Sequence, residues 1–281
     1  MAAILLAGMA VPPHAQDMLA NPVPPPAVLT NGGKPMLLPF QCADEDIRWA
    51  GMSCSEDAPC PVFLELATVE ALGNRILAAG NIHGDAVTLY SVLLASDDNG
   101  LSWREPHERI RGAGLDHIEH LGAGVAWIAG QVLFPFTQDP FLLVSTDGGV
   151  SWRQREVLSE ENESRFGSIQ QFYFTTRESG TLLLDRGAGE SGARYALYES
   201  SNGGETWAVK QESRKPIVSK RPATPASDWR VRADAGLKSF IVEHRAGTQW
   251  NTVAAFLVAL DSCKPGEPVA TPVPPASGEK P

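Results

Sequence analysis

The chain has 281 residues and a formal net charge of −10, from 33 acidic and 23 basic side chains. This acidic balance argues against nucleic acid or an anionic membrane as partner, because phosphate groups require clustered lysine and arginine. The length suits one large all-β domain, and a hydrophobic content of 43% is enough to form a core.

The first 16 residues are typical of an export signal. An apolar run over residues 1–10 is followed by a small-residue cleavage site after Ala15. The run is too short to cross a membrane, and it lacks the basic segment that opens a full signal peptide. We therefore expect a secreted or periplasmic protein whose signal is weak or begins upstream, with no integral membrane segment. A disordered cytoplasmic N-terminus is the alternative.

Proline-rich segments bracket the middle of the chain. Residues 17–35 are predicted to be a linker, and residues 264–281 a disordered tail, because such compositions stay extended and solvated. The folded domain is then expected over residues 36–263.

Four cysteines support export, since an even number in an exported chain indicates disulfides. Cys54 and Cys60 enclose a short loop and form a plausible local pair, whereas Cys42 and Cys263 flank the folded region. Four cysteines allow three connectivities, and reduced buried thiols are the alternative. A zinc site is not expected, because no C-x-x-C or histidine cluster accompanies them.

Short apolar runs bounded by Gly, Asn, Asp and Pro predict strands, and no amphipathic helix of normal length is found. The predicted strands cover residues 63–69, 88–95, 141–145 and 181–185, and the alternating segment 229–233.

One motif repeats along the chain, with the form Ser-x-(Asp/Asn)-x-Gly-x-(Ser/Thr)-Trp. Its copies start at Ser96, Ser145 and Ser200, at intervals of 49 and 55 residues. Each copy follows an apolar strand and precedes a polar one. The residues that define the motif are Ser96, Asp98, Gly100 and Trp103, then Ser145, Asp147, Gly149 and Trp152, then Ser200, Asn202, Gly204 and Trp207.

The chemistry of the motif is that of a tight hairpin corner. Asp or Asn at the start of a turn bonds the backbone further on, and Gly supplies the positive φ that the turn needs. The hydroxyl satisfies remaining turn donors, while Trp packs over the turn. A calcium loop at Asp97 and Asp98 is not favoured, because the EF-hand spacing is absent.

This repeat resembles the Asp-box, or BNR, repeat of sialidases and of many non-enzymatic β-propellers, including photosystem II assembly factors. The resemblance covers about residues 60–262. It implies a propeller of about four blades, incomplete or open, with each box between the third and fourth strands, away from the ligand site. Blades are expected near residues 62–110, 115–158, 166–213 and 228–262. The last has lost its box, except for a remnant near Trp250, and residues 36–50 are a candidate closing strand.

The same resemblance raises a sialidase-like glycoside hydrolase as the alternative function. That activity requires three arginines, a tyrosine nucleophile paired with a glutamate, and an acid/base aspartate. The Arg-Ile-Pro motif that usually accompanies them is absent. The best local cluster is a candidate ligand patch consisting of Arg186, Glu190, Arg194 and Tyr195, although Gly-rich loops often carry such charges for solubility alone.

Other polar clusters give weaker indications. On a strand, His117 and Glu119 would share a face while His120 points away, and the helical spacing of a metal site is missing. Arg230, Arg232, His244 and Arg245 make the last blade locally basic, either for an anionic partner or as an ordinary solvent-facing strand.

The preferred hypothesis is an exported, non-enzymatic propeller that serves as a binding or assembly scaffold for a protein or glycan. No motif indicates a metal, a cofactor or a catalytic nucleophile, and the oligomeric state is left open.

Overall fold

The computed structural model describes residues 27–157, 167–187, 192–222, 226–260 and 262–265. These residues form strands almost throughout, with one helix, α1 (Asp44–Trp49), so the predicted all-β class is confirmed. The predicted signal and most of the C-terminal tail lie outside the described residues. Within them, no helix has both the length and the apolar character to cross a bilayer.

Four main sheets make up the domain, each built from consecutive antiparallel strands except for one parallel strand at the edge of the fourth. The first contains β4 (Phe63–Leu72), β5 (Arg75–His83) and β6 (Thr88–Ser96), beside which β7 (Ser102–Trp103) runs. The second contains β8 (Ala113–Leu121), β9 (Val125–Val132), β10 (Pro140–Ser145) and β11 (Arg153–Glu156). The third contains β12 (Ser168–Phe174), β13 (Gly180–Asp185), β14 (Tyr195–Ser200) and β15 (Ala208–Ser213). The fourth contains β16 (Trp229–Asp234), β17 (Ser239–Ala246), β18 (Gln249–Val258) and β2 (Met36–Leu38).

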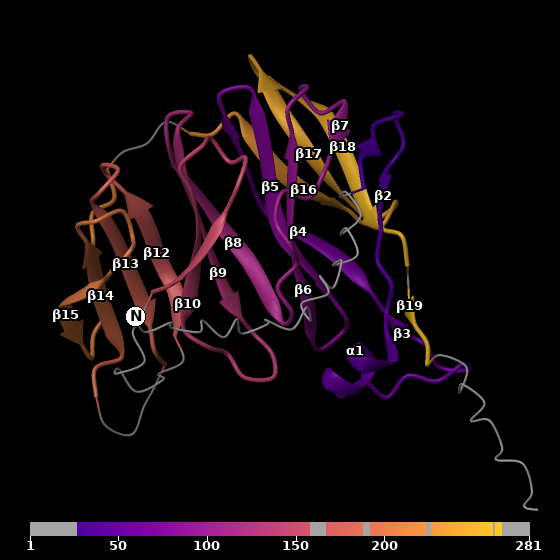
Figure 1. Cartoon of the computed structure of the whole chain (residues 1–281), viewed down its shortest axis with the longest axis horizontal. Coiled ribbons are helices and arrows are strands. Elements are labelled where there is room, and N and C mark those ends of the chain that lie inside the picture. Colours follow the sequence, from indigo (N-terminus) through magenta and orange to yellow (C-terminus); the bar gives the residue numbers. More distant parts are fainter. Residues whose placement is uncertain (1–26, 158–166, 188–191, 223–225, 261, 266–281) are drawn as a thin grey trace, which may run out of the picture.

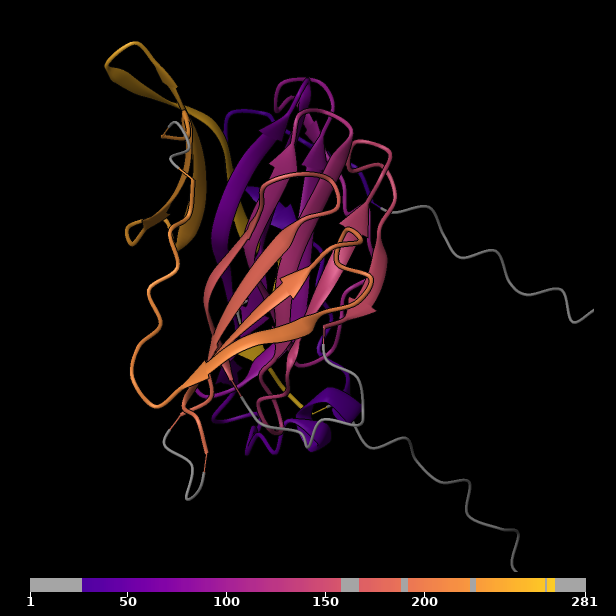
Figure 2. The ribbon, with the colours of Figure 1, turned by 90° about the vertical axis from the view of Figure 1, so that its left-hand side faces the viewer.

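The sheets stand side by side and pack face to face (Figure 1). The third sheet packs on the second, the second on the first, and the first on the fourth, whose strands stand at one side of the molecule in Figure 2. Radial packing of four-stranded meanders is the architecture of a β-propeller, as predicted. Among the described residues, no core cluster joins the third sheet to the fourth, so the arc of sheets is open there.

The core consists of separate apolar layers between neighbouring sheets. One layer lies between the first and fourth sheets around Leu94 and Phe256, and another between the first and second around Leu77 and Leu143. In the layer between the second and third sheets, Trp127 stacks on Phe174 with ring centroids 3.8 Å apart. Because strands alternate their side chains, the middle strands bury both faces and are apolar almost throughout.

Each repeat motif forms a turn between the third and fourth strands of its sheet. In the first turn, Ser96 Oγ donates to Asp98 Oδ1 at 2.9 Å and accepts from the Gly100 amide at 2.8 Å. The Asp98 carboxylate then accepts from the Ser102 amide at 2.8 Å and the Ser102 hydroxyl at 2.6 Å. The second turn repeats this network at Ser145, Asp147 and Ser151.

The tryptophans of the turns differ in one respect. Trp103 Nε1 donates to the Gly100 carbonyl at 3.2 Å, and Trp152 Nε1 donates to the Gly149 carbonyl at 3.1 Å. In the third turn, Asn202 replaces aspartate and Trp207 Nε1 is buried without a hydrogen-bond partner among the described residues. A ring from the neighbouring sheet bonds this turn one residue earlier, since Trp127 Nε1 donates to the Gly203 carbonyl at 2.9 Å.

The motif glycine of each turn, three residues before the tryptophan, lies against the preceding sheet. A Cβ on Gly149 would lie 3.3 Å from Leu77 of the first sheet, and one on Gly204 would lie 3.1 Å from Leu142 of the second. A Cβ on Gly100 would lie 2.4 Å from Val253 of the fourth sheet. The fourth sheet therefore packs against the turn of the first sheet in the same way as the first sheet packs against the turn of the second.

The predicted remnant of a box near Trp250 is wrong. The turn at Gly247 joins β17 to β18, which are the second and third strands of the fourth sheet, whereas the boxes follow the third strand. The outer position of this sheet is occupied instead by β2, which pairs in parallel with β18. Residues 36–50 thus contribute the strand that the sequence led us to expect.

Long-range contacts tie the start of the domain to its end. Cys42 and Cys263 form a disulfide across 221 residues, and Cys54 and Cys60 form a second, local one. Beside the second disulfide, β3 (Cys60–Pro61) pairs with β19 (Ser262–Cys263). The segment predicted as a linker already contributes β1 (Leu29–Thr30), which pairs with β7. Asn31 then bonds the carbonyls of Gly100 and Val253 at 3.0 and 2.7 Å.

The contact between Gly100 and Val253 generates the first prediction. Gly100→Ala is expected to lower the free energy of unfolding by about 3 kcal/mol, because it adds an overpacked Cβ to the cost of a positive φ. Gly247→Ala is the control, since Gly247 also has a positive φ but no atom within 4 Å of the added Cβ. It should cost only about 1 kcal/mol in denaturant unfolding. Equal losses would contradict the role of this contact.

We expect the hydrogen bonds of the second turn to stabilise the folded protein by an amount that depends on pH. Burial tends to raise the pKa of Asp147, but hydrogen bonds from Ser151, Ser145 and Val150 outweigh it and lower the pKa to about 2. The stabilisation is therefore present above the pKa of unfolded aspartate, about 3.9, and is lost as the pH falls through 2.

The variant Asp147→Asn should still form the turn, because Asn202 occupies the same position in the third turn. Its stability should no longer depend on the pH through this side chain. The difference in melting temperature between the two proteins should shrink between pH 4 and pH 2, corresponding to less than about 1 kcal/mol because Asp147 is exposed. A difference that stays constant over this range would rule out the carboxylate as its source.

Candidate binding cleft on the inner strands

The strands at the inner edges of the first three sheets share a β-bulge. The register shifts at Ala67 in β4, at Asp116 in β8 and at Gln170 in β12. A bulge bends its strand and redirects a side chain out of the regular alternation. Because β4 packs beside β8 and β8 beside β12, the three bulges lie along one inner edge of the arc.

A second sequence repeat, a glycine followed by an amide residue, lies opposite two of the bulges. This repeat was not predicted from the sequence. Gly80 and Gly130 pair with the residues that precede the bulges of β4 and β8. A Cβ on Gly80 would lie 1.9 Å from the Glu65 carbonyl oxygen, so a larger residue does not fit. Each glycine precedes a buried amide, Asn81 or Gln131. The shared Ala-Gly-(Asn/Gln) sequence is the pattern from which these two positions could have been identified.

A cleft of about 450 Å³ opens between the inner strands of the second and third sheets. This volume lies within the range of about 300–1,000 Å³ that is typical of ligand sites. Most of the lining residues are polar types, namely amides and charged groups, with one phenylalanine ring among them. The lining residues are Asp116, His117, Gln131, Ser168, Ile169, Gln170, Gln171, Phe172 and Arg221.

A buried carboxylate positions two of the lining residues, His117 and Arg221. Glu119 is 8% exposed, and its Oε1 lies 2.7 Å from His117 Nε2 and forms an ion pair with Arg221. His117 and Glu119 therefore share a face of β8, as predicted. His120 points elsewhere and lies 3.9 Å from Glu70, which raises the pKa of its imidazole against the opposing effect of burial.

The bulge residue Asp116 stands at the mouth of the cleft. Part of the residue is exposed, but the surrounding walls desolvate its carboxyl group and raise its pKa, and the charge of Glu65 raises it further. Among the described residues, no lysine or arginine forms an ion pair with Asp116. Only the charge of the neighbouring His117 opposes this rise in pKa, and Asp116 is the one carboxylate among the described lining residues.

The cleft is bounded on one side by Arg221, which belongs to the connector between β15 and β16. The described parts of the connector are residues 214–222 and 226–228. Tyr173 Oη lies 3.1 Å from Ser219 Oγ, Arg221 pairs with Glu119, and Ser227 Oγ donates to Glu70 at 3.2 Å. The connector is therefore attached to three sheets in turn.

In the candidate ligand patch, Arg186 and Arg194 lie on paired backbone, where the Arg186 amide donates to the Arg194 carbonyl at 2.7 Å, but their guanidinium groups bond different residues. The patch stays a prediction. The Arg186 side chain is 6% exposed, faces Asp139 at 3.7 Å and donates to the Tyr198 hydroxyl. Arg194 forms a bidentate pair with Asp185 and covers the ring of Tyr195. Glu190 lies outside the described residues.

The basic residues of the fourth sheet are largely neutralised. Arg230 and Arg232 both bond Glu243, at 2.7 and 3.4 Å, and Arg245 bonds Asp228 at 2.6 Å. The Arg230 guanidinium also lies 4.1 Å from the centroid of the Trp250 ring. His244 packs against Trp229, with ring centroids 4.5 Å apart.

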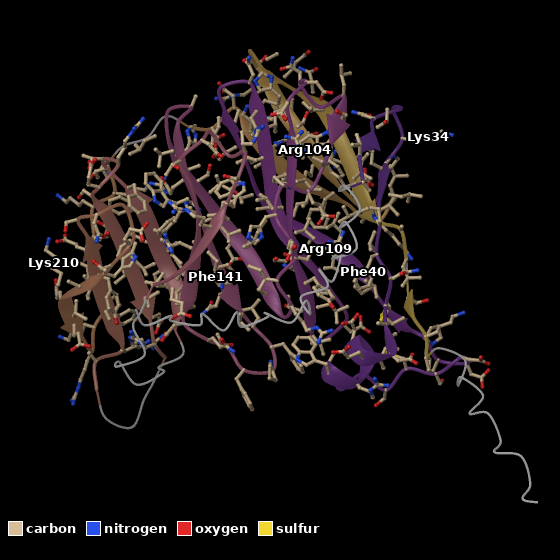
Figure 3. The ribbon with its side chains drawn as sticks, in the orientation of Figure 1. Lys34, Phe40, Arg104, Arg109, Phe141 and Lys210 are labelled. Carbon is tan, nitrogen blue, oxygen red and sulfur yellow. A yellow bond between two sulfur atoms is a disulfide. The ribbon has the colours of Figure 1, made fainter. Side chains whose placement is uncertain are left out.

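A second hollow, of about 510 Å³, includes Phe40 and Arg109, which are labelled in Figure 3. Its polar groups are already bonded to the protein. Arg109 forms a bidentate pair with Glu105 at 2.7 Å, and the Tyr90 hydroxyl donates to Asp46 at 2.5 Å. Because these groups are committed, this hollow offers less to a ligand than the cleft.

Comparison with known proteins leaves the family of this chain open. No known protein-family profile matches the sequence. No curated protein matches it either.

Solved structures show a distant similarity. A GH74 xyloglucanase from Xanthomonas campestris is 18% identical, with a TM-score of 0.36 over 48% of this chain. YCF48 bound to D1 peptide is 17% identical, with a TM-score of 0.39 over 69%. The endosialidase of phage phi92 is 9% identical, with a TM-score of 0.40 over 79%. This chain covers 18%, 56% and 51% of their respective lengths, and neither a substrate nor a partner carries over from them.

The contact between Glu119 and the connector generates a prediction of its own. Glu119→Gln should release Arg221, lower the free energy of unfolding by about 2 kcal/mol and speed tryptic cleavage after Lys220. Glu199→Gln makes the same charge change at the exposed pair with Lys210, which Figure 3 labels on β15. It should cost less than about 1 kcal/mol and leave cleavage unchanged. Equal cleavage rates would contradict the attachment.

Proposed function

We propose that this chain is an exported, non-enzymatic β-propeller scaffold, and that the cleft between β8 and β12 binds an extended segment of a protein partner. The two disulfides support an oxidising, extracytoplasmic location, because such bonds are rare in a reducing cytosol. The observation that carries the proposal is the row of amide side chains in the cleft.

Three glutamines line the cleft: Gln131, Gln170 and Gln171. Gln131 is buried and its Nε2 is already bonded to the Gln138 and Gly167 carbonyls, so Gln170 and Gln171 are the two that a ligand would bond. An amide side chain offers both a donor and an acceptor, which is the pairing that a peptide backbone requires. A glycan usually also requires an exposed aromatic face, but the one aromatic lining residue, Phe172, is only 3% exposed. This lining therefore favours a polypeptide over a sugar.

The lining also argues against sialidase chemistry. Among the described residues, one arginine, Arg221, lines the cleft, and it is already paired with Glu119. A carboxylate grip by three arginines would need further guanidinium groups. Arg186, next to Gly167, faces Asp139, and the basic cluster on the fourth sheet is bonded to Glu243 and Asp228. No tyrosine is among the described residues that line the cleft.

The proposal is tested by blocking the cleft. Peptides selected on the purified protein by display should lose at least about ten-fold in affinity on Gln170→Trp, which fills the cleft and removes one amide, equivalent to about 1.4 kcal/mol. Gln211→Trp is the control, because Gln211 is an equally exposed glutamine on the distant strand β15.

Two outcomes would overturn the proposal. One is that selected peptides bind equally well to both variants, or that only glycans on an array are retained. The other is steady hydrolysis of a fluorogenic sialoside that Gln170→Trp abolishes, which would favour the glycoside hydrolase instead.

A further inference from the structure

The charge of the cleft is uneven. Glu119 is neutralised by Arg221 and hydrogen-bonded to His117, so that wall carries no excess negative charge. Asp116 has no such partner, and Glu65 of the first sheet is near enough to oppose its ionisation. The mouth of the cleft therefore has negative potential, in a chain that is acidic overall.

One lining residue of the cleft, Gln171, carries an acceptor that nothing in the described structure satisfies, and that a ligand would reach once this side chain turns toward the cleft. The Oε1 atom of Gln171 is buried and has no hydrogen-bond partner there. Gln131, by contrast, uses its Nε2 to bond the carbonyls of Gln138, at 2.7 Å, and Gly167. An unmet buried acceptor costs about 1–3 kcal/mol, so a ligand with an N–H donor at this position would recover that energy.

The two observations select one kind of group. A hydroxyl or a neutral amide could bond Gln171 but would leave the Asp116 carboxylate without an ion-pair partner. An anion would be repelled by this carboxylate. A lysine ammonium carries the charge on a single point, whereas a guanidinium has five donors in a planar fork that can reach separate acceptors at once.

We propose that the cleft holds an arginine side chain of the bound segment, with Asp116 receiving its charge and Gln171 Oε1 accepting one of its N–H groups. This inference rests on the proposed function, because it specifies the residue of the partner that the cleft recognises. Arg221 does not compete for this position, since Glu119 retains it.

The test uses three capped pentapeptides, Ser-Gly-Xaa-Gly-Ser, in which Xaa is arginine, lysine or citrulline. Citrulline keeps the shape of arginine but carries no charge. Each peptide is titrated at millimolar concentration into the full chain, and the backbone amides of residues 114–117 and 168–172 are followed by NMR. The arginine peptide should bind most tightly, at least about five-fold more tightly than the citrulline peptide, as expected for one charge-assisted hydrogen bond.

Asp116→Asn should reduce the affinity for the arginine peptide to that of the citrulline peptide. Asp85→Asn is the control, because it removes one negative charge from an exposed site outside the cleft. Gln171→Leu should weaken the arginine peptide as well, since it removes the acceptor.

The inference is overturned if arginine and citrulline peptides bind alike, if Asp116→Asn has no more effect than Asp85→Asn, or if no peptide shifts the cleft amides. A lysine peptide that matches arginine would also overturn the guanidinium assignment. The proposed function is judged separately: if displayed peptides still depend on Gln170, the cleft binds a segment without an arginine. If they do not, both proposals fail.

Discussion

The stacking of the sheets depends on the absence of side chains at three turn positions. Gly100, Gly149 and Gly204 each bring the backbone of a corner against an apolar side chain of the preceding sheet. The Ser–Asp or Ser–Asn network of the same turn holds that backbone in place, so a local set of hydrogen bonds sets the distance between sheets. The inner strands, and the cleft between them, take their positions from this spacing.

This dependence explains why so much of the fold could be predicted. A turn motif is local, and its residues are contiguous in the sequence, so three copies at a regular interval also indicated the boundaries of the first three sheets. The fourth sheet was harder, because its outer strand β2 comes from the other end of the domain and pairs in parallel. The remnant near Trp250 was misplaced because a Gly-x-x-Trp sequence also suits an ordinary hairpin.

The cleft could be predicted only in part. His117 and Glu119 were placed correctly on one face because strand alternation is a local rule. That rule does not foresee a bulge, which redirects Asp116 toward the third sheet. Nor does it predict the ion pair between Arg221 and Glu119, because the two residues are far apart in the chain and neither local sequence indicates the contact.

The pairing of β2 with β18 has a consequence for how the chain is made. A ribosome releases Met36 long before Phe256, the residue it faces in the finished sheet. Until the C-terminal strands emerge, β2 exposes an unpaired edge and the apolar surfaces of Met36 and Leu38, which are buried in the folded protein. Such a topology has a high contact order and folds slowly, so pairing of this edge with another copy competes with folding until the C-terminal strands are made.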